Sequence, residues 1–480
     1  MKLGELLMAA GLIDATQLAA ALARQQHHGG RLGENLVAMN VLTPAAFAAF
    51  MHRVPREPDS LAATAVDDSV LLDLALKLIH RGRLETAPRL ADAIGLPPHL
   101  ALELMRRGVE RQWLRAAGTQ EGAASYALTE EGARHAREAL QQSGYVGPAP
   151  VALADFIAMV EAQKIANIVV TADKIRAAFG ALIVAERFVE RLGPALNSGR
   201  ALLLYGPPGN GKTSVAQRFA SIFDDIVYIP YAVSIDGHIM RVYDPSVHVA
   251  QTVASVYERV GRSLLRAEEA DARWVACRRP FLVAGGELTL EMLDLQFDPT
   301  TQFYEAPLHV KALGGCFVID DFGRQLVSPT ALLNRWIVPM ESRVDYLKLR
   351  TGKSFAVPFE ELLVFSTNLE PEELMDPAFL RRLPYKLEVG GPGRARYREI
   401  FAQACARQGL TLDDETFATI VQRVTVDKKL ELAAYQPGFI VDQVVATCRF
   451  LGLPPRFEPR FIEYAVDNLK THRQDTPSRA

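Results

Sequence analysis

Ala201-Leu-Leu-Leu-Tyr205-Gly206-Pro207-Pro208-Gly209-Asn210-Gly211-Lys212-Thr213-Ser214 is an apolar run followed by a glycine-rich turn and the polar start of a helix. The apolar run predicts a buried strand, and the residues from Thr213 to Ala220 predict a helix. The glycines between them let the backbone curl, so that successive N–H groups and the helix N-terminus point at one anion. The stretch therefore predicts a phosphate-binding loop between a strand and a helix.

The side chains of this loop narrow the chemistry to a nucleotide. Lys212 is expected to place its charge on the β- and γ-phosphates, and the Thr213 hydroxyl is expected to hold Mg²⁺. We predict nucleotide contacts from Gly206, Pro207, Pro208, Gly209, Asn210, Gly211, Lys212, Thr213 and Ser214. An ordinary glycine-rich turn is the alternative, and the strand and helix on either side disfavour it.

Length and composition bound the architecture. At 480 residues the chain exceeds the size of one hydrophobic core, so about three or four domains are expected. With 49% hydrophobic and 23% charged residues, the composition is that of a folded globular protein, so long disordered stretches are not expected. A net charge of −3 gives no overall reason to expect binding to nucleic acid or membranes, so such a function would need a local patch.

The cysteines exclude several chemistries. They are Cys277, Cys316, Cys405 and Cys448, which lie far apart and form no C-x-x-C pair. Zinc binding, a disulfide scaffold and thiol redox chemistry are therefore not expected, and a reducing compartment fits.

The chain also lacks the apolar run of about eighteen residues that a membrane span needs. Glu5 and Asp14 are charged where a signal peptide would be uncharged. We expect a cytoplasmic protein with no membrane span.

The first fifty residues contain a repeat. Residues 2–13 read KLGELLMAAGLI, and residues 31–42 read RLGENLVAMNVL. Each copy continues into an alanine-rich amphipathic helix, so two similar helical units are expected to pack as a pair. Residues 2 to about 54 resemble the MshEN domain, the N-terminal module of secretion and type IV pilus ATPases. This resemblance implies binding of cyclic di-GMP.

The repeat departs from the MshEN pattern at three positions. Lys2 stands where the family has Arg, and a lysine cannot supply the planar fork of donors that Arg offers a phosphate or guanine. Asn40 replaces a Gly and Val54 replaces a Gln, whereas Gln25 is kept. The alternative is a helical module that docks another protein, since helix burial alone explains every apolar position.

A second small domain follows a proline-containing linker. Its expected elements are helices at 70–80, 86–94 and 97–112, short strands at 113–115 and 125–128, and a last helix at 129–140. This order resembles a winged helix-turn-helix.

If this domain reads DNA, its third helix enters the major groove and Arg106, Arg107 and Arg111 face phosphates or bases. Glu103 and Glu110 lie on the same helix, and no basic stripe continues into the strands. Because DNA affinity depends mainly on neutralising phosphates, contact with a protein is the favoured interpretation.

Two later strands end in polar residues suited to hydrolysis. The apolar run 316–319 is followed by Asp320 and Asp321, where Asp320 is expected to hold Mg²⁺ and Asp321 to activate the attacking water. A third predicted strand, at 362–368, ends in Asn368, a residue type that orients this water. The segment Asp376-Pro-Ala-Phe-Leu380-Arg381-Arg382 comes next.

Taken together, these motifs resemble the AAA+ ATPase module over about residues 165–395. The resemblance implies that Asn368 is sensor 1 and that Arg381 or Arg382 is a finger reaching the γ-phosphate of a neighbouring subunit. It therefore implies ATP and Mg²⁺ as cofactors and a homo-oligomer, expected as a hexamer. A solvated helix end is the alternative for the two arginines.

We predict a multidomain protein with an α/β P-loop core built on a parallel sheet. The expected parts are a small helical domain at 1–55, a linker at 56–66, a winged-helix-like domain at 67–145, a linker helix at 146–164, the AAA+ core at 165–395 and an α-helical lid at 396–475. Helices are also expected at 154–163 and 172–196. About ninety residues before Asp320 are expected to be a family-specific addition and a partner surface.

Two features depart from the usual AAA+ pattern. The second acid is Asp321 rather than Glu, and no arginine stands at the expected sensor 2 position in 435–442. The leading hypothesis is a ring-forming remodelling or chaperone-like ATPase with a protein client. The alternatives are a DNA-binding regulator whose assembly is switched by nucleotide, and a nucleotide-gated scaffold with little turnover.

Overall fold

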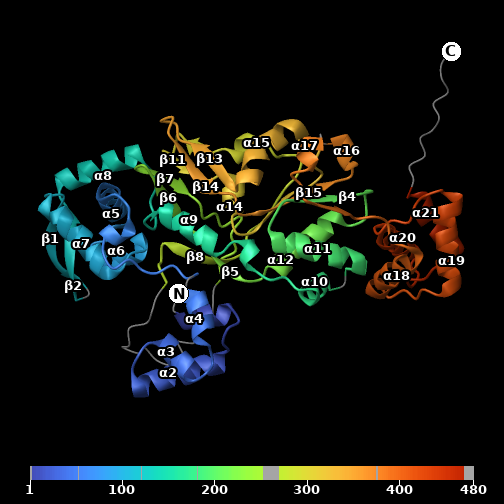
Figure 1. Cartoon of the computed structure of the whole chain (residues 1–480), viewed down its shortest axis with the longest axis horizontal. Coiled ribbons are helices and arrows are strands. Elements are labelled where there is room, and N and C mark those ends of the chain that lie inside the picture. The colour runs from blue at the N-terminus through green and yellow to red at the C-terminus, as the bar shows by residue number, and fades with distance from the viewer. Residues whose placement is uncertain are drawn as a thin grey trace, which may run out of the picture. The chain divides into compact units, whose positions relative to one another are not determined.

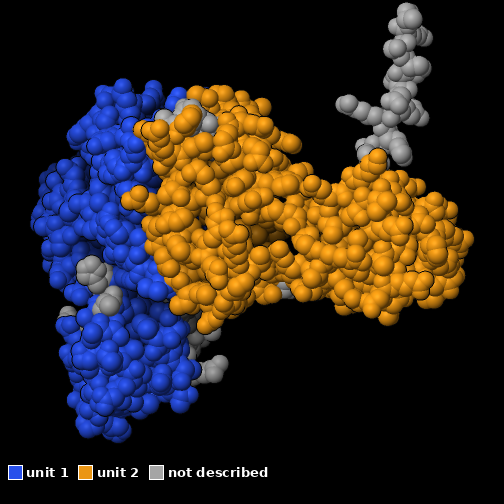
Figure 2. Space-filling model, turned by 45° about the vertical axis from the view of Figure 1, so that its right-hand side comes forward, with its two compact units in different colours: residues 1–169, 223–317, 331–362 blue, residues 170–222, 318–330, 363–480 orange. Residues whose placement is uncertain are grey.

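The computed structural model describes residues 3–51, 53–120, 122–180, 182–251, 270–374 and 377–469. The chain forms two compact units that alternate along the sequence (Figure 2). Unit 1 contains residues 1–169, 223–317 and 331–362, and unit 2 contains residues 170–222, 318–330 and 363–480.

The N-terminal repeat of unit 1 folds into four helices around one core. The helices are α1 (Leu3–Ala9), α2 (Ala15–His28), α3 (Leu32–Ala38) and α4 (Pro44–Met51). Leu7 from the first copy and Leu36 from the second are fully buried in the same apolar cluster. A Cβ at Gly33 would lie 2.0 Å from the Phe47 ring, which explains the glycine in the second copy. The two helical units therefore pack together as predicted, and Lys2 lies outside the described residues.

The next segment has the predicted order of three helices, two strands and a helix. It contains the short 3-10 helix η1 (Ala62–Thr64), then α5 (Asp68–Gly82), α6 (Ala87–Ile94), α7 (Pro98–Glu110), β1 (Leu114–Gln120), β2 (Ala123–Leu128) and α8 (Glu130–Gln142). The helices share one apolar cluster. The first strand is longer than predicted, because Ala116 and Gly118 have low strand propensity but are held by antiparallel pairing with Tyr126 and Ser125 on β2, while the register shifts between them at Ala117.

The remainder of unit 1 is a mixed α/β structure. It comprises β3 (Val151–Ala152), α9 (Leu153–Ala162), η2 (Ile165–Asn167), β5 (Ile226–Pro230), β6 (Ala232–Ile235), β7 (His238–Arg241), β8 (Trp274–Arg278), β9 (Phe281–Ala284), η3 (Glu291–Leu293), β10 (Gln296–Asp298), β11 (Phe303–Glu305), α14 (Leu308–Lys311), most of α15 (Pro329–Ser342), β13 (Val344–Lys348) and β14 (Ser354–Pro358). One sheet has the order β10-β11-β7-β6-β3. The residues before Asp320 that were predicted as an addition thus supply four of the five strands of this sheet.

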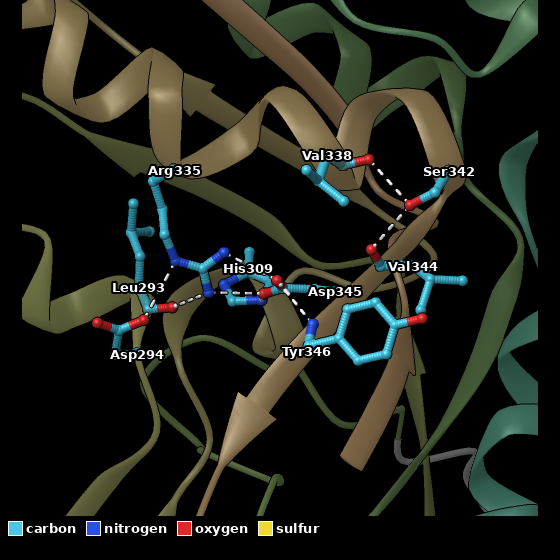
Figure 3. Close-up of polar contacts among 9 residues, drawn as sticks. All are labelled: Leu293, Asp294, His309, Arg335, Val338, Ser342, Val344, Asp345 and Tyr346. Carbon is cyan, nitrogen blue, oxygen red and sulfur yellow. Dashed lines mark hydrogen bonds and ion pairs between the residues drawn. The ribbon is translucent and has the colours of Figure 1, made fainter. Parts of the chain in front are cut away.

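A cluster of buried charges joins three parts of unit 1 (Figure 3). Both terminal nitrogens of Arg335, on α15, donate to the two carboxylate oxygens of Asp345, on β13, at 2.8 Å. Asp345 Oδ2 also lies 2.9 Å from Nε2 of His309, whose ring is 0% exposed. Arg335 Nε donates to Asp294 at 3.1 Å. Removing Arg335 or Asp345 would leave the other's largely buried charge without its main partner, so the cluster ties α14, α15 and β13 together.

His309 should make the stability of the protein depend on pH. Burial lowers the pKa of its imidazole, against the opposing effect of Asp345. His309 in the unfolded chain therefore binds a proton at a higher pH than it does in the folded protein. The free energy of unfolding is unaffected well above the ordinary pKa of 6.5 and decreases as the pH falls below it. We expect His309→Gln to flatten this loss between about pH 7 and pH 5, by at most about 1.4 kcal/mol per pH unit.

Urea unfolding across this pH range measures the effect. His28→Gln, at an exposed position on α2, is the matched control and should follow the wild type. Parallel curves for His309→Gln and the wild type would show that His309 does not contribute.

Unit 2 contains the predicted parallel sheet with helices around it. Its elements are α10 (Ala172–Phe179), α11 (Glu186–Ser198), β4 (Leu202–Tyr205), α12 (Lys212–Ile222), β15 (Leu362–Thr367), α16 (Pro371–Leu374), α17 (Pro377–Leu380) and β16 (Tyr385–Glu388). β4 pairs in parallel with β15 on one side and with β16 on the other. The strand β12 (Cys316–Ile319), which ends in unit 2, follows β15 in the sheet order. Every residue of β15 is buried, as expected of a strand covered on both faces.

One helix prediction in this unit is wrong. The single helix expected over 172–196 is two helices, because Gly180, with φ 50°, leaves the helical region and ends α10. The second helix, α11, begins only at Glu186.

Four α-helices form a C-terminal bundle, which groups together in Figure 1. They are α18 (Arg394–Gln408), α19 (Asp414–Gln422) with a π-helical extension η4 (Arg423–Asp427), α20 (Gln436–Phe450) and α21 (Pro459–Asp467). Tyr397, Phe401, Ile420 and Ile440 are fully buried in its core. The predicted helical character of this region is confirmed as far as Asp467, and residues 470–475 lie outside the described residues. Within the ranges described, no helix has the length and apolar character needed to cross a membrane.

Candidate nucleotide-binding site

The loop between β4 and α12 has the backbone that the glycines predict. Gly206, Gly209 and Gly211 have φ values of 132°, 77° and 88°, which side chains of L-residues disfavour. At two of these three positions there is also no space for a Cβ atom. A Cβ at Gly206 would lie 2.8 Å from the Val389 carbonyl oxygen, and one at Gly209 would lie 2.3 Å from the Tyr435 ring.

The Lys212 ammonium is held inside this loop. The residue is 7% exposed, and its Nζ donates to the carbonyl oxygens of Gly206 at 2.8 Å and Pro207 at 3.0 Å. Burial lowers the pKa of Lys212, while Asp321 and Asp320 act in the opposite direction. A cation in this position is available to an anionic group that enters the loop.

The two acids meet the loop at the end of β12. Thr213 Oγ1 donates to Asp320 Oδ2 at 2.7 Å. Asn368 Nδ2 donates to Asp321 Oδ1 at 3.2 Å, and the Asp321 N–H donates to Asp320 Oδ1 at 3.1 Å. The structure therefore brings together Thr213, Asp320, Asp321 and Asn368 from three separate segments of the chain.

A cavity of about 780 Å³ opens over this group, within unit 2. This is within the size range of small-molecule sites. Of the predicted nucleotide contacts, Pro208 to Ser214 line it, as do Asp320, Asp321 and Asn368. Gly206 and Pro207 instead hold Lys212 through their carbonyl oxygens. The other walls come from residues 182–185, Phe188, residues 388–392 and the C-terminal bundle.

Sequence reasoning missed the contribution of α18 to this cavity. Arg396, Ile400, Gln403, Ala404 and Arg407 all line the cavity and recur at the spacing of one helix face. The sequence led us to expect an arginine from the C-terminal helices only at 435–442, around the start of α20, and none stands there. Two arginines from another helix therefore supply positive charge to the same cavity.

The two arginines predicted as a finger do not line this cavity. Arg381 and Arg382 follow the short helix α17, with Arg381 exposed and Arg382 partly exposed. Neither residue is among those that line the cavity. Asp376, from the same motif, lies outside the described residues.

The donor set around Thr213 fits a magnesium ion bound with a phosphate ligand. The Thr213 hydroxyl and the Asp320 carboxylate are adjacent oxygen donors, the kind that Mg²⁺ prefers. Over the described ranges, no cluster of three or more His, Cys, Asp or Glu side chains is placed to hold a metal. Mg²⁺ commonly takes one or two protein ligands and completes its shell with substrate phosphates and water, so the residues fit it as a partner of the nucleotide.

Three comparisons relate the chain to known proteins. The model of a domain of unknown function, DUF8689, matches residues 393–468, which is the C-terminal bundle. No curated protein matches the chain. Among solved structures, the Thermotoga maritima RuvB Holliday junction branch migration motor aligns with 60% of this chain and 70% of that chain, at 14% identity and a TM-score of 0.33. A point mutant of Thermotoga maritima RuvB aligns with 64% of this chain and 73% of that chain, at 13% identity and a TM-score of 0.33. At these values the similarity carries no argument about the function of this chain.

The close approach of Tyr435 to the loop leads to a test of the site. We expect Gly209→Ala to weaken nucleotide binding by about tenfold or more, because the added methyl group meets the Tyr435 ring in a backbone conformation that alanine disfavours. Adding Tyr435→Ala should restore part of the affinity, since it removes the clash but not the strain. Titration with a fluorescent ATP analogue measures both effects.

Gly393→Ala is the control, because a Cβ there meets nothing within 4 Å. Unchanged affinity in Gly209→Ala would contradict the proposed position of the nucleotide.

Proposed function

We propose that this protein is an ATP-hydrolysing protein of the AAA+ type that forms a ring and remodels a protein client. The observation that carries the proposal is the convergence of a buried lysine, a paired hydroxyl and carboxylate, and a second carboxylate held by an amide, all beside one cavity. These are the groups that binding and hydrolysis of a nucleoside triphosphate require.

Each side chain has a separate role in the proposed reaction. The loop N–H groups and Lys212 bind the β- and γ-phosphates, and Thr213 with Asp320 would hold Mg²⁺, which neutralises charge on the phosphate oxygens when bound. Asn368 donates to Oδ1 of Asp321, which leaves Oδ2 to accept a proton from the attacking water. The apolar residues 182–185 and the α18 face would hold the base.

The role of Asp321 is tested by Asp321→Asn. The amide keeps the size of the side chain but cannot take the proton, so we expect turnover to fall by roughly 10²- to 10⁴-fold with nucleotide affinity retained. Phosphate release and equilibrium binding of nucleotide measure the two quantities. Asp173→Asn, at an exposed acid on α10, is the matched control.

If Asp321→Asn releases phosphate at the wild-type rate, Asp321 does not have the proposed role. A wild-type protein that binds ATP without releasing phosphate would instead favour the nucleotide-gated scaffold.

The position of the arginine pair supports a site shared between subunits. Arg381 and Arg382 lie in the same unit as the cavity and do not line it, so a role at the γ-phosphate requires another copy of the chain. In the proposed homo-oligomer, a hexamer by resemblance, they stabilise charge on the phosphate of the neighbouring subunit.

A mixing experiment tests this arrangement. The double variant Arg381→Ala, Arg382→Ala keeps Asp321 but lacks the arginines, whereas Asp321→Asn keeps the arginines. Each should be inactive alone. In mixed rings, a site in the first variant can receive the arginines of a neighbouring second variant. With random equimolar assembly, half of the subunits keep Asp321 and half of their neighbours keep the arginines, so phosphate release should reach up to about a quarter of the wild-type rate. Mixed rings that form and stay inactive would contradict a shared site.

The N-terminal repeat is proposed to dock a protein client rather than to sense cyclic di-GMP. Gln25, which the MshEN resemblance keeps, is 6% exposed, and its Nε2 donates to the Gly30 carbonyl oxygen at 2.9 Å. It is therefore committed to the turn between the two copies. Calorimetric titration of the full chain with cyclic di-GMP separates the alternatives, since the docking proposal predicts no heat of binding.

The winged-helix-like domain is likewise proposed to contact protein. Arg107 on α7 forms ion pairs with both Asp68 and Glu103, and the Arg111 guanidinium lies 5.3 Å from the centre of the Trp113 ring. Arg107 is thus already neutralised, which disfavours the DNA-binding regulator. Salt-dependent DNA binding by the full chain would instead support the DNA-binding regulator.

A further inference from the structure

Asp321 has a backbone conformation that needs support. Its φ is 49°, in the left-handed region that residues with a side chain adopt infrequently. The turn that follows it begins at Phe322, which is 1% exposed and whose N–H donates to the Ser366 carbonyl oxygen at 2.7 Å. Thr367 Oγ1 donates to the Phe322 carbonyl oxygen at 2.8 Å. One side of the turn is therefore fixed to β15.

The side chain of Gln325 holds the other side of the turn. Its Nε2 donates to the carbonyl oxygen of Asp320 at 2.9 Å and to that of Asp321 at 3.2 Å. Its Oε1 accepts from the N–H of Gly323 at 2.8 Å. One amide group thus bonds to the backbone of both acids and to the residue two positions beyond Asp321.

We propose that Gln325 is a positioning residue for ATP hydrolysis. Its amide keeps Asp321 in the left-handed conformation in which the carboxylate meets Asn368, and so aims Oδ2 at the water. The inference rests on the proposed function, because it assigns Gln325 to the same site. Gln325 is not among the residues that line the cavity, so it acts through Asp321 and not on the nucleotide.

The geometry requires an amide at this position. The donor Nε2 faces two carbonyl oxygens, whereas the acceptor Oε1 faces an N–H group. An ionised glutamate has acceptors only, so one of its oxygens would face two carbonyl oxygens of like partial charge. A protonated glutamate has one donor and one acceptor and restores part of the pattern. Gln325→Glu is therefore expected to lose function at neutral pH and to regain part of it as the pH falls.

The experiment compares four full-length proteins: wild type, Gln325→Ala, Gln325→Glu and Leu326→Ala. Leu326 is the matched control because its side chain, next in the chain, is 84% exposed. Phosphate release against ATP concentration gives kcat and KM, a fluorescent ATP analogue gives affinity, and thermal unfolding checks the fold.

For Gln325→Ala we expect kcat to fall roughly tenfold to a hundredfold, with KM and affinity within about twofold of wild type. Leu326→Ala should match the wild type. The ratio of Gln325→Glu activity to wild-type activity should rise as the pH falls from about 7.5 to about 5.5, because the fraction of protonated glutamate, which has a donor, increases over this range. This ratio tests the inference even if the alanine variant is unstable, since glutamate keeps the length of the side chain.

Wild-type kcat in Gln325→Ala would overturn the inference, as would a loss confined to KM or a pH-independent ratio for Gln325→Glu. These outcomes would leave the proposed function intact as long as the wild type releases phosphate. Absence of phosphate release by the wild type would overturn both.

Discussion

The hydrogen bond between the Thr213 hydroxyl and the Asp320 carboxylate joins the two halves of the candidate site. It links the start of α12 to the end of β12 at 2.7 Å, across more than a hundred residues of chain. This contact is possible because β4 pairs in parallel with β15, and the sheet order brings β12 next to β15. The loop after β4, the acids after β12 and Asn368 after β15 all follow the carboxyl ends of strands, where ligands of open α/β sheets bind.

Two buried cations among the described residues, Arg335 in unit 1 and Lys212 in the candidate site, differ in their hydrogen-bond partners. In unit 1 the Arg335 guanidinium has carboxylate partners on two sides, and Asp345 also meets His309, so the charges satisfy one another. In the candidate site, Lys212 instead bonds to neutral carbonyl oxygens of its own loop. A paired charge holds the fold, whereas a cation bonded only to carbonyl groups retains a net attraction for an anion. In this respect the candidate site differs from the Arg335 cluster.

The sequence was sufficient to predict the parts of the site that are local motifs. The glycine pattern, Lys212 and Thr213 occupy one short segment, and the acid pair and Asn368 each follow an apolar run, so the strands were recognisable together with the residues at their ends. The parallel sheet and the helical C-terminal region were expected from the resemblance to AAA+ ATPases, and the structure contains both.

The remaining features depend on tertiary contacts. Gln325 looks like any polar loop residue until its amide is seen to contact the backbone of both acids. Arg396 and Arg407 line the cavity only because α18 turns one face toward it, and amphipathic spacing does not reveal what a face will meet. The partnership of His309 with Asp345 likewise joins residues distant in sequence, which no local pattern encodes.

The most direct test of the central claim is phosphate release from ATP by the purified full-length protein, measured beside Lys212→Ala with and without Mg²⁺. The account predicts Mg²⁺-dependent release by the wild type that is lost in Lys212→Ala, because this substitution removes the cation from the loop that we propose binds the phosphates. Equal release by the two proteins, or ATP binding by the wild type with no release in Mg²⁺, would contradict it.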